Sequence, residues 1–351
     1  MKTVKCGIIG CGVIAPSHIE SYRNLSGVEI KTLCDLVKSK AEKLAEKYSV
    51  PVVCVDYKDI LNDPEIDCVS VCTDHGSHAR VVTDALDAGK HVICEKALGA
   101  SSDCLTTMEV AHARNSHLIF TGIFQHRFEN ITRLIKEFID RDGFGTLTTV
   151  NLNSALLRTH EYYRQDKWRG TWAEEGGSLL INQAIHYIDL INWLCGGVEE
   201  VSARFENLTH QDVIETEDTA VAIMKFKKGF IGSITATASS VETWRHTIVI
   251  SGTEGFVELN NDEVTYYNFS NKDLRQEFAE RLSSCSEEKR INAGKTYYGE
   301  GHPAQIKDFI DAIRERRAPF VSAESARSTV EIVLACYESG RSGKWVKTGR
   351  N

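Results

Sequence analysis

The segment Gly10-Cys11-Gly12-Val13-Ile14-Ala15 constrains the fold of this chain more than any other feature. It follows an apolar run at 4–9 and precedes a helix-like segment, where a G-x-G-x-x-[GA] pattern binds the pyrophosphate of a dinucleotide. Gly10 permits the tight turn, Gly12 lets the backbone approach the phosphates, and the small Ala15 allows close helix–strand packing. Amide groups at the start of the following helix, with Val13 and Ile14 in the loop, are expected to face the phosphates.

An acidic residue, Asp35, stands 20 residues beyond Ala15, at the end of the second predicted strand. A carboxylate there can accept hydrogen bonds from the adenosine ribose and would repel the extra phosphate of NADP. We therefore expect NAD as the cofactor. Lys38 and Lys40 lie close by and weaken this preference, so NADP stays open as the less favoured alternative.

The first 120 residues alternate between short apolar runs and helix-like segments. Strict alternation of strand and helix gives right-handed crossovers and a parallel sheet that is covered on both faces. This predicts an α/β fold that begins with a doubly wound Rossmann domain over residues 1–122. The predicted strands span 4–9, 29–34, 52–55, 68–72, 91–94 and 118–121, and the predicted helices span 38–48, 77–88 and 103–114.

The pattern of predicted elements changes after residue 122, from alternating strands and helices to successive strands. A predicted helix at 128–140 is followed by strand-like stretches separated by glycine-containing turns, which is typical of antiparallel sheet. We expect a substrate-binding and oligomerisation domain over 123–351, of α+β type with a large, mostly antiparallel open sheet. Its predicted strands span 147–156, 201–208, 220–226, 230–238, 246–251, 255–259 and 263–269, and its helices 179–194, 303–316 and 323–339. The helix at 323–339 is expected to pack back near the first domain, and residues 270–298 to form a mobile flap or an exposed helix.

Composition excludes several classes of protein. A formal charge of −8, from 41 basic and 49 acidic side chains, argues against a nucleic-acid surface and a polybasic membrane anchor. The 11 cysteines include no C-x-x-C pair, so we expect small buried side chains in a reducing cytoplasm. The apolar stretch 176–198 carries polar residues that are too costly for a lipid-facing helix. No metal-binding cluster stands out, and we expect a cytoplasmic protein without a metal site.

Further motifs resemble one oxidoreductase family along nearly the whole chain. They are Asp63-Pro64-Glu65-Ile66-Asp67, Val69-Ser70-Val71-Cys72-Thr73, Ala88-Gly89-Lys90-His91-Val92, Cys94-Glu95-Lys96, Trp168-Arg169-Gly170-Thr171-Trp172, the run from Gly176-Gly177 to His186, Glu331-Ile332-Val333-Leu334 and Tyr337-Glu338-Ser339. In this order they resemble the Gfo/Idh/MocA family, which includes glucose–fructose oxidoreductase and inositol dehydrogenase. The resemblance implies an NAD(P)-dependent dehydrogenase or reductase acting on a CH–OH group of a sugar-like substrate. It also implies a homodimer or homotetramer formed through the C-terminal sheet.

The same resemblance implies roles for three residues. Lys96 is similar to the lysine that contacts nicotinamide and the substrate hydroxyl, and His186 to the residue of proton transfer. Asn182 stands where many members have aspartate. The Asn-Gln-Ala-Ile-His sequence resembles a subgroup that acts on sugars and nucleotide-sugar uronates, often at C3. Ala97 replaces the usual proline, and because a non-proline cis bond costs about 3 kcal/mol we expect a different backbone there.

The residues themselves support this chemistry. Lys96 closely follows the fifth predicted strand, and ligands of an open parallel sheet lie at the carboxyl ends of its strands. His186 has the acid–base range that proton transfer needs. On one helix Asn182, His186 and Asp189 would share a face, with Asp189 as a structural partner. Thr73, His78 and Glu95 join the expected cofactor contacts, although Glu95 is equally able to pair with a neighbouring side chain.

A basic and aromatic stretch follows a predicted strand and includes Arg158, Tyr163 and Trp168. Aromatic faces stack on sugar rings and arginine clamps carboxylate or phosphate, so we expect these residues, with Arg127, to contact the substrate. An ordinary exposed loop or subunit contact is the equal alternative. His126 and His302 are weaker candidates for the same pocket.

Two other functions stay open. One is a glycosidase in which NAD oxidises C3 transiently and is regenerated in place. The other is a non-catalytic NAD-binding sensor, against which the presence of Glu95, Lys96 and His186 argues.

Overall fold

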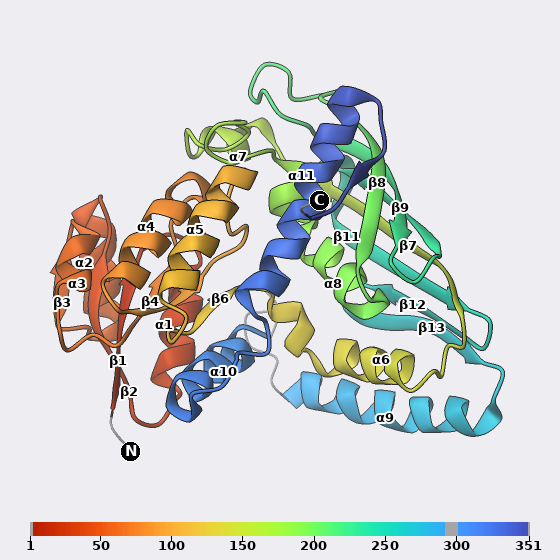
Figure 1. Cartoon of the computed structure of the whole chain (residues 1–351), viewed down its shortest axis with the longest axis horizontal. Coiled ribbons are helices and arrows are strands. Elements are labelled where there is room, and N and C mark those ends of the chain that lie inside the picture. The colour runs from red at the N-terminus through yellow and green to blue at the C-terminus, as the bar shows by residue number, and fades with distance from the viewer. Residues whose placement is uncertain (1–2, 292–300, 350–351) are drawn as a thin grey trace. The chain divides into compact units, whose positions relative to one another are not determined.

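The computed structural model describes residues 3–291 and 301–349. The chain forms two compact units, coloured along the sequence in Figure 1. The first unit comprises Met1–Gln125 with Glu300–Arg327, and the second comprises His126–Gly299 with Ser328–Asn351. The division is therefore not a single cut of the chain, because a segment near the C-terminus belongs to the first unit.

The first unit contains a six-stranded sheet in the order β3-β2-β1-β4-β5-β6. All neighbouring strands pair in parallel, which confirms the predicted Rossmann sheet. The strand order reverses between β1 and β4, so the carboxyl ends of these two strands mark the ligand-binding crevice of such a sheet. The strands are β1 (Val4–Ile9), β2 (Val28–Cys34), β3 (Val52–Cys54), β4 (Cys68–Val71), β5 (His91–Cys94) and β6 (Phe120–Gly122).

Helices cover this sheet, and one of them comes from far along the chain. The helices are α1 (Ala15–Arg23), α2 (Lys38–Tyr48), α3 (Tyr57–Leu61), α4 (His75–Asp87), α5 (Ser102–Arg114) and α10 (Gly301–Glu315). Ile306, Phe309 and Ile310 of α10 are buried in the same hydrophobic cluster as Ile19 and Tyr22 of α1. Burying large apolar side chains contributes roughly 1.5–3 kcal/mol each, which explains why this C-terminal helix belongs to the first unit.

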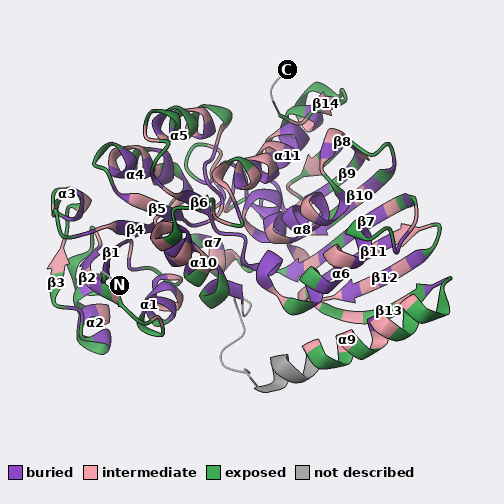
Figure 2. Ribbon diagram, turned by 60° about the horizontal axis from the view of Figure 1, so that its bottom comes forward, coloured by how far each residue is buried: buried purple, intermediate pink, exposed green. Residues whose placement is uncertain are grey.

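The second unit contains an eight-stranded sheet in the order β13-β12-β11-β7-β10-β9-β8-β14. Only β10 and β7 pair in parallel, so the predicted mostly antiparallel sheet is confirmed. The strands are β7 (Leu147–Leu157), β8 (Val198–Glu206), β9 (Thr219–Phe226), β10 (Ile231–Thr237), β11 (Ser239–Gly252), β12 (Gly255–Asn260), β13 (Glu263–Phe269) and β14 (Val346–Lys347). Buried and exposed residues alternate along β7, β9 and β10, because one face of the sheet packs on helices and the other faces solvent (Figure 2).

The helices of this part of the chain are η1 (Gln125–Phe128), α6 (Asn130–Asp140), α7 (His160–Arg164), η2 (Leu179–Ala184), α8 (Ile185–Cys195), α9 (Lys272–Ile291) and α11 (Ala323–Ser342). Of the two alternatives for the charge-rich segment 270–298, α9 bears out the helix over 272–291, and most of the side chains over 272–285 are exposed or half-buried. Residues 292–298 lie outside the described part of the chain.

The predicted helical segment over 179–194 is present, but its first part is not α-helical. Leu179–Ala184 forms a π-helix, η2, and the α-helix α8 begins only at Ile185. The buried carboxylate of Glu217 accepts hydrogen bonds from the backbone N–H groups of Ser178 (3.2 Å) and Leu180 (2.9 Å). This long-range contact fixes the first turn, and short π-helical turns of this kind are frequent at functional sites.

The cysteines behave as expected. All 11 are free thiols, and eight of them are buried. None of the helices in the described part of the chain is long and apolar enough to cross a bilayer.

Candidate active site

The glycine loop between β1 and α1 has the shape that a pyrophosphate requires. Gly10 has φ +95°, and a Cβ added to it would lie 2.4 Å from the carbonyl oxygen of Cys72, so only glycine fits. A Cβ added to Gly12 would meet no atom within 4 Å. No described residue accepts a hydrogen bond from the N–H groups of Gly12, Val13 or Ile14. The loop therefore leaves open space bordered by unused donors at the start of a helix, which fits a bound pyrophosphate.

Asp35 lies directly beside this loop. Its Oδ2 accepts a hydrogen bond from the N–H of Cys11 (2.8 Å), and its Oδ1 accepts one from the N–H of Val37 (2.8 Å). These two bonds orient the carboxylate at the end of β2, and each oxygen keeps a lone pair for a ribose hydroxyl. The nearby Lys38 is turned to Glu42, with 3.1 Å between Nζ and the carboxylate, so its charge is partly offset.

The loop that carries Lys96 follows β5 at the same edge of the sheet. The bond between Lys96 and Ala97 is cis, so the expectation that alanine in place of proline changes this backbone was wrong. Two histidines of α4 hold the loop. His75 Nε2 accepts a hydrogen bond from the N–H of Ala97 (3.2 Å), and His78 Nδ1 lies 2.8 Å from the Ala97 carbonyl oxygen.

His78 itself is completely buried, and its Nε2 lies 3.1 Å from the carbonyl oxygen of Thr73. Burial lowers the pKa of His78, so the neutral ring donates to one of its two carbonyl partners at a time. The geometry favours a role in joining the loops after β4 and β5 over direct contact with a cofactor. The Thr73 hydroxyl donates to the Asp74 carbonyl oxygen (3.3 Å), and Thr73 is partly exposed at this edge.

Glu95, next to Lys96, is buried and pairs with two histidines. Its Oε1 lies 2.8 Å from His18 Nε2 and 3.4 Å from His302 Nε2. Burial alone would raise the pKa of Glu95, but the hydrogen bonds from both histidines hold it well below the usual value. Of the two alternatives for Glu95, the structure shows the pairing with neighbouring side chains.

In the second unit, Asn182 lies in the π-helix and donates through Nδ2 to the carboxylate of Glu175. The other oxygen of Glu175 accepts from the N–H of Gly170. Burial raises the pKa of Glu175 to about 7. Asn182 is therefore positioned by a carboxyl group that titrates near neutral pH, and its side-chain oxygen faces away from that bond.

His186 lies in the first turn of α8, beside a second charged cluster. Its ring centroid is 5.1 Å from that of His126, whose Nδ1 lies 3.0 Å from Glu129 and 3.3 Å from Asp262. Burial alone would lower the pKa of His126, but the two carboxylates hold it well above its usual value. The His126 ring and its two carboxylate partners therefore lie directly beside the ring of His186.

Asp189, the third residue predicted on the face of this helix, points elsewhere. It binds Arg127, with 2.7 Å between Arg127 Nε and Asp189 Oδ2, and accepts a hydrogen bond from Thr329 (2.7 Å). Arg127 and Asp189 are both nearly inaccessible. The geometry therefore favours a structural ion pair over the predicted contact of Arg127 with substrate.

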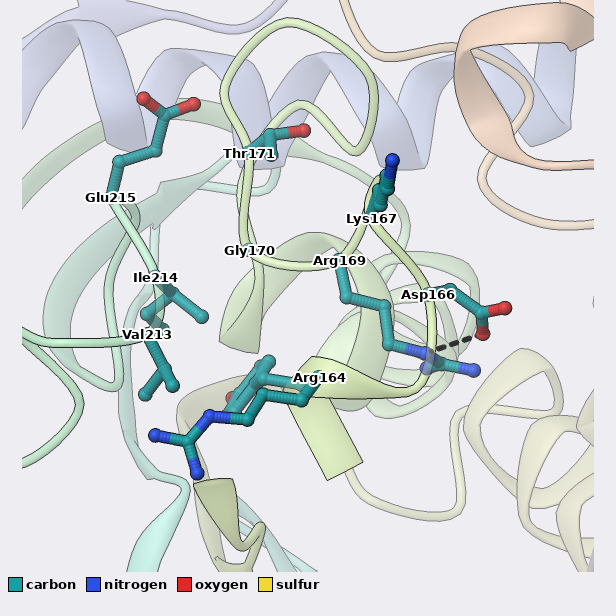
Figure 3. Close-up of a pocket in the computed structure, with 10 residues that line it drawn as sticks. Arg164, Asp166, Lys167, Arg169, Gly170, Thr171, Val213, Ile214 and Glu215 are labelled. Atoms are coloured by element: carbon teal, nitrogen blue, oxygen red, sulfur yellow. Dashed lines mark hydrogen bonds and ion pairs between the residues drawn. The ribbon is translucent and has the colours of Figure 1, made fainter. Parts of the chain in front are cut away.

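The basic and aromatic stretch borders a pocket of about 390 Å³, shown in Figure 3. Its lining includes Tyr163, Arg164, Lys167 and Arg169. Arg164 and Lys167 point in different directions in Figure 3, and Arg169 is bound to Asp166 (3.0 Å), so the basic groups do not converge on one point.

The three residues of this stretch that we expected to contact substrate are all engaged inside the unit. Arg158 Nη2 donates to Gln183 Oε1 (2.6 Å), and the guanidinium also lies over the Trp244 ring. Tyr163 is buried with its hydroxyl 3.1 Å from Ser178 Oγ, and Trp168 lies under the guanidinium of Arg169. These contacts favour the structural alternative for this stretch.

Sequence reasoning missed several charged groups of the site. His18, Glu129, Glu175 and Asp262 were not singled out, and His126 and His302 were only weak candidates. Nothing in the local sequence marks Glu175 as a buried residue. The others gave no local signal, since each becomes significant only through a partner far away in sequence.

Comparison with known proteins identifies the family. The Gfo/Idh/MocA oxidoreductase family matches over residues 4–122 by its NAD-binding Rossmann fold and over residues 136–348 by its C-terminal alpha/beta domain. The chain belongs to this family. The expected oxidoreductase with a nicotinamide cofactor is thereby confirmed.

Individual relatives are similar over about two thirds of the chain or more. Myo-inositol 2-dehydrogenase of Thermotoga maritima is 24% identical over 98% of both chains. Inositol 2-dehydrogenase of Gluconacetobacter diazotrophicus is 31% identical over 65% of both chains. The WlbA dehydrogenase of Bordetella pertussis, solved with NADH and UDP-GlcNAcA, is 25% identical with a TM-score of 0.89, covering 100% of this chain and 99% of that one.

The two loop glycines should respond differently to alanine. Gly10→Ala forces a side chain against the Cys72 carbonyl and into a positive-φ backbone, so we expect a loss of about 2 kcal/mol or more of unfolding free energy. Gly12→Ala should leave unfolding within about 0.5 kcal/mol of wild type but weaken NAD binding at least about tenfold. Urea unfolding and calorimetric titration with NAD measure both. Unchanged NAD affinity in Gly12→Ala would contradict the placement of the pyrophosphate.

Stability should depend on pH through Glu175. Its pKa rises from 4.5 to about 7 on folding, so the stabilising contribution is complete below pH 4.5 and is lost as pH rises to about 7. Relative to Glu175→Gln, the wild type should lose about 3 kcal/mol of unfolding free energy over this range, at 1.36 kcal/mol per pKa unit. Glu174→Gln, at the exposed neighbouring position, is the control and should follow wild type. Parallel curves for wild type and Glu175→Gln would refute the shift.

Proposed function

We propose that the protein transfers hydride between NAD and a secondary hydroxyl or keto group of a sugar or cyclic polyol. The observation that carries the proposal is the edge of the first-unit sheet. There the open glycine loop, the oriented Asp35 and the loop of Lys96 lie at the carboxyl ends of β1, β2 and β5. This is the edge at which a doubly wound sheet binds a dinucleotide.

Oxidation of an alcohol removes a hydride from carbon and a proton from oxygen. NAD, held by the glycine loop and Asp35, supplies the hydride acceptor. Lys96 polarises the hydroxyl with its ammonium group, and His186 accepts the proton. Asn182, which is held by Glu175, orients the substrate by hydrogen bonding, and His126 lies beside the ring of His186.

The substrate class is supported by relatives rather than by a single pocket residue. Two relatives are inositol 2-dehydrogenases, and WlbA was solved with a nucleotide-sugar uronate. The basic groups of the pocket at 163–171 do not converge, which favours a neutral polyol or sugar over an anion. Oxidation at C3 of a hexose, uronate or glycoside remains part of the proposal, and NADP is the second cofactor to test.

Lys96→Ala should lower NADH formation by roughly 10²–10⁴-fold, because one positioned acid–base group contributes about that much. NAD affinity should stay unchanged, since the pyrophosphate and adenosine contacts remain. The measurement is NADH absorbance with a panel of inositols, hexoses, uronates and glycosides. Lys307→Ala, an exposed lysine on α10, is the matched control and should retain full turnover.

The same panel separates the remaining alternatives. Glycoside cleavage without net NADH would indicate the glycosidase. NAD binding without turnover of any compound would indicate a sensor. Full turnover by Lys96→Ala would refute the assigned role of the lysine.

We also propose that two copies meet through the open face of the second sheet. Val221, Ile223 and Ile231 are about half exposed on neighbouring strands β9 and β10. Ile223 and Ile231 are diagonal neighbours on this face, because Ile223 pairs with Ser233. Such an apolar row on a flat face favours a second copy of the same sheet over water.

The double substitution Ile223→Asp with Ile231→Asp should convert a dimer or tetramer to monomers, because it buries like charges in the contact. Light scattering coupled to gel filtration gives the mass. Leu208→Asp, at an exposed leucine outside the sheet, should leave the mass unchanged. A monomeric wild type would contradict the proposed contact.

A further inference from the structure

A chain of buried hydrogen bonds connects the interior of the first unit to Glu95. Tyr22 Oη lies 2.8 Å from Ser70 Oγ, Ser70 Oγ lies 3.0 Å from His18 Nδ1, and His18 Nε2 lies 2.8 Å from Glu95 Oε1. Tyr22, Ser70 and His18 are essentially inaccessible to solvent. The order of protons along this chain decides the charge that Glu95 presents.

The hydroxyl protons have only one satisfactory order. Ser70 is the only partner of the Tyr22 hydroxyl among the described residues, so Tyr22 must donate to Ser70. Burial raises the pKa of Tyr22 well above its usual value, which keeps that proton in place. Ser70 then donates its own proton to His18 Nδ1, because its other partner is already the donor.

His18 is therefore a neutral imidazole with its proton on Nε2, donating to Glu95. In the opposite tautomer Ser70 Oγ would accept from both Tyr22 and His18, and the buried Ser70 O–H would be left without an acceptor, which is costly. His18 stabilises the carboxylate without neutralising it.

His302 is governed by the same reasoning. Its Nε2 lies 3.4 Å from Glu95 Oε1, while its buried Nδ1 has no hydrogen-bond partner in the described part of the chain. An imidazolium would bury an unsatisfied charged N–H group, whereas the neutral Nε2–H form leaves only an unused acceptor. His302 is therefore a second neutral donor.

Apart from the two histidines, no described residue forms an ion pair with Glu95. Its Oε2 accepts from the N–H of Lys96 (3.2 Å), and no lysine or arginine side chain of residues 3–291 and 301–349 forms an ion pair with it. The neighbouring thiols of Cys72 and Cys94 are neutral, since burial raises the pKa of each well above its usual value. Glu95 thus holds a buried negative charge at the carboxyl end of β5.

The position of the Glu95 carboxylate at the end of β5 indicates which half of a bound dinucleotide would lie near it. Asp35 at the end of β2 marks the half of the sheet that binds adenosine, so the nicotinamide half of the dinucleotide lies over β4, β5 and β6. Oxidised nicotinamide carries a positive charge and reduced nicotinamide is neutral. We propose that Glu95, held ionised by neutral His18 and its Ser70–Tyr22 chain, is a counter-ion that makes the protein prefer oxidised over reduced cofactor.

This inference rests on the proposed function but is separable from it. The quantity to measure is the ratio of Kd for NADH to Kd for NAD+, obtained by calorimetric titration of the full chain. Glu95→Gln keeps the shape and removes the charge, so the ratio should fall on the order of tenfold, mainly through weaker NAD+ binding. Asp35→Asn, a carboxylate-to-amide change in the adenosine half, should weaken both forms equally and leave the ratio unchanged.

His18 provides the second pair of variants. His18→Gln can still accept from Ser70 and donate to Glu95, so it should keep the wild-type ratio. His18→Phe removes the donor, leaves the buried carboxylate to take up a proton, and should lower the ratio toward that of Glu95→Gln. These two variants test the proposal even if Glu95→Gln does not fold.

The tautomer is tested directly by 15N NMR of the imidazoles, where His18 should give the signals of a neutral Nε2–H ring. An imidazolium at His18 near neutral pH, or an unchanged ratio in Glu95→Gln and His18→Phe with both dinucleotides still bound, would overturn the inference alone. A wild type that binds neither NAD+ nor NADH would overturn the proposed function, and this inference with it.

Discussion

The contact of Gly10 with the end of β4 is the constraint on which the first unit depends. The N–H of Gly10 donates to the Cys34 carbonyl oxygen (2.8 Å), while its Cα faces the Cys72 carbonyl so closely that no side chain fits. The chain is therefore held between the ends of β2 and β4 and must turn outward. That turn leaves the N–H groups of the loop open to a phosphate, and it brings the N–H of Cys11 to the carboxylate of Asp35. One steric constraint therefore produces both the phosphate-binding loop and the oriented carboxylate.

The two carboxylates of this edge show how surroundings assign different roles to one chemical group. Asp35 is partly exposed and held by backbone N–H groups, which suits exchange of hydrogen bonds with ribose hydroxyls. Glu95 is buried and held by neutral imidazoles, which preserves its charge in a medium of low polarity. In the second unit the arrangement is inverted, since His126 lies between two carboxylates that raise its pKa.

Local patterns predicted the framework of the fold well. The bounds of β1, α2, β5 and β13 agree with the predicted ranges, because each is a short apolar or amphipathic run with a clear end. The predicted strand at 246–251 was too short, since β11 extends to Ser239 by pairing with β7 beyond an irregularity between Ser239 and Trp244. A bulged pairing of this kind depends on the partner strand and leaves no period in the sequence.

The candidate site residues that belong to a local motif were identified from the sequence. The residues whose role depends on a partner far away in the sequence were missed. The glycine loop and Asp35 lie where the motif places them. His18 looks like an ordinary helical residue until Glu95, 77 positions later, gives it a role.

Arg127, Arg158 and Tyr163 have the side chains of a sugar site, but each is engaged inside its own unit. The polar side chains that bind a ligand are of the same types as those that form hydrogen bonds inside a protein. Residue type alone therefore cannot distinguish a binding role from a structural role. The partner of each polar atom gives the additional information: Arg127 pairs with the buried Asp189, and Glu95 pairs with His18 and His302.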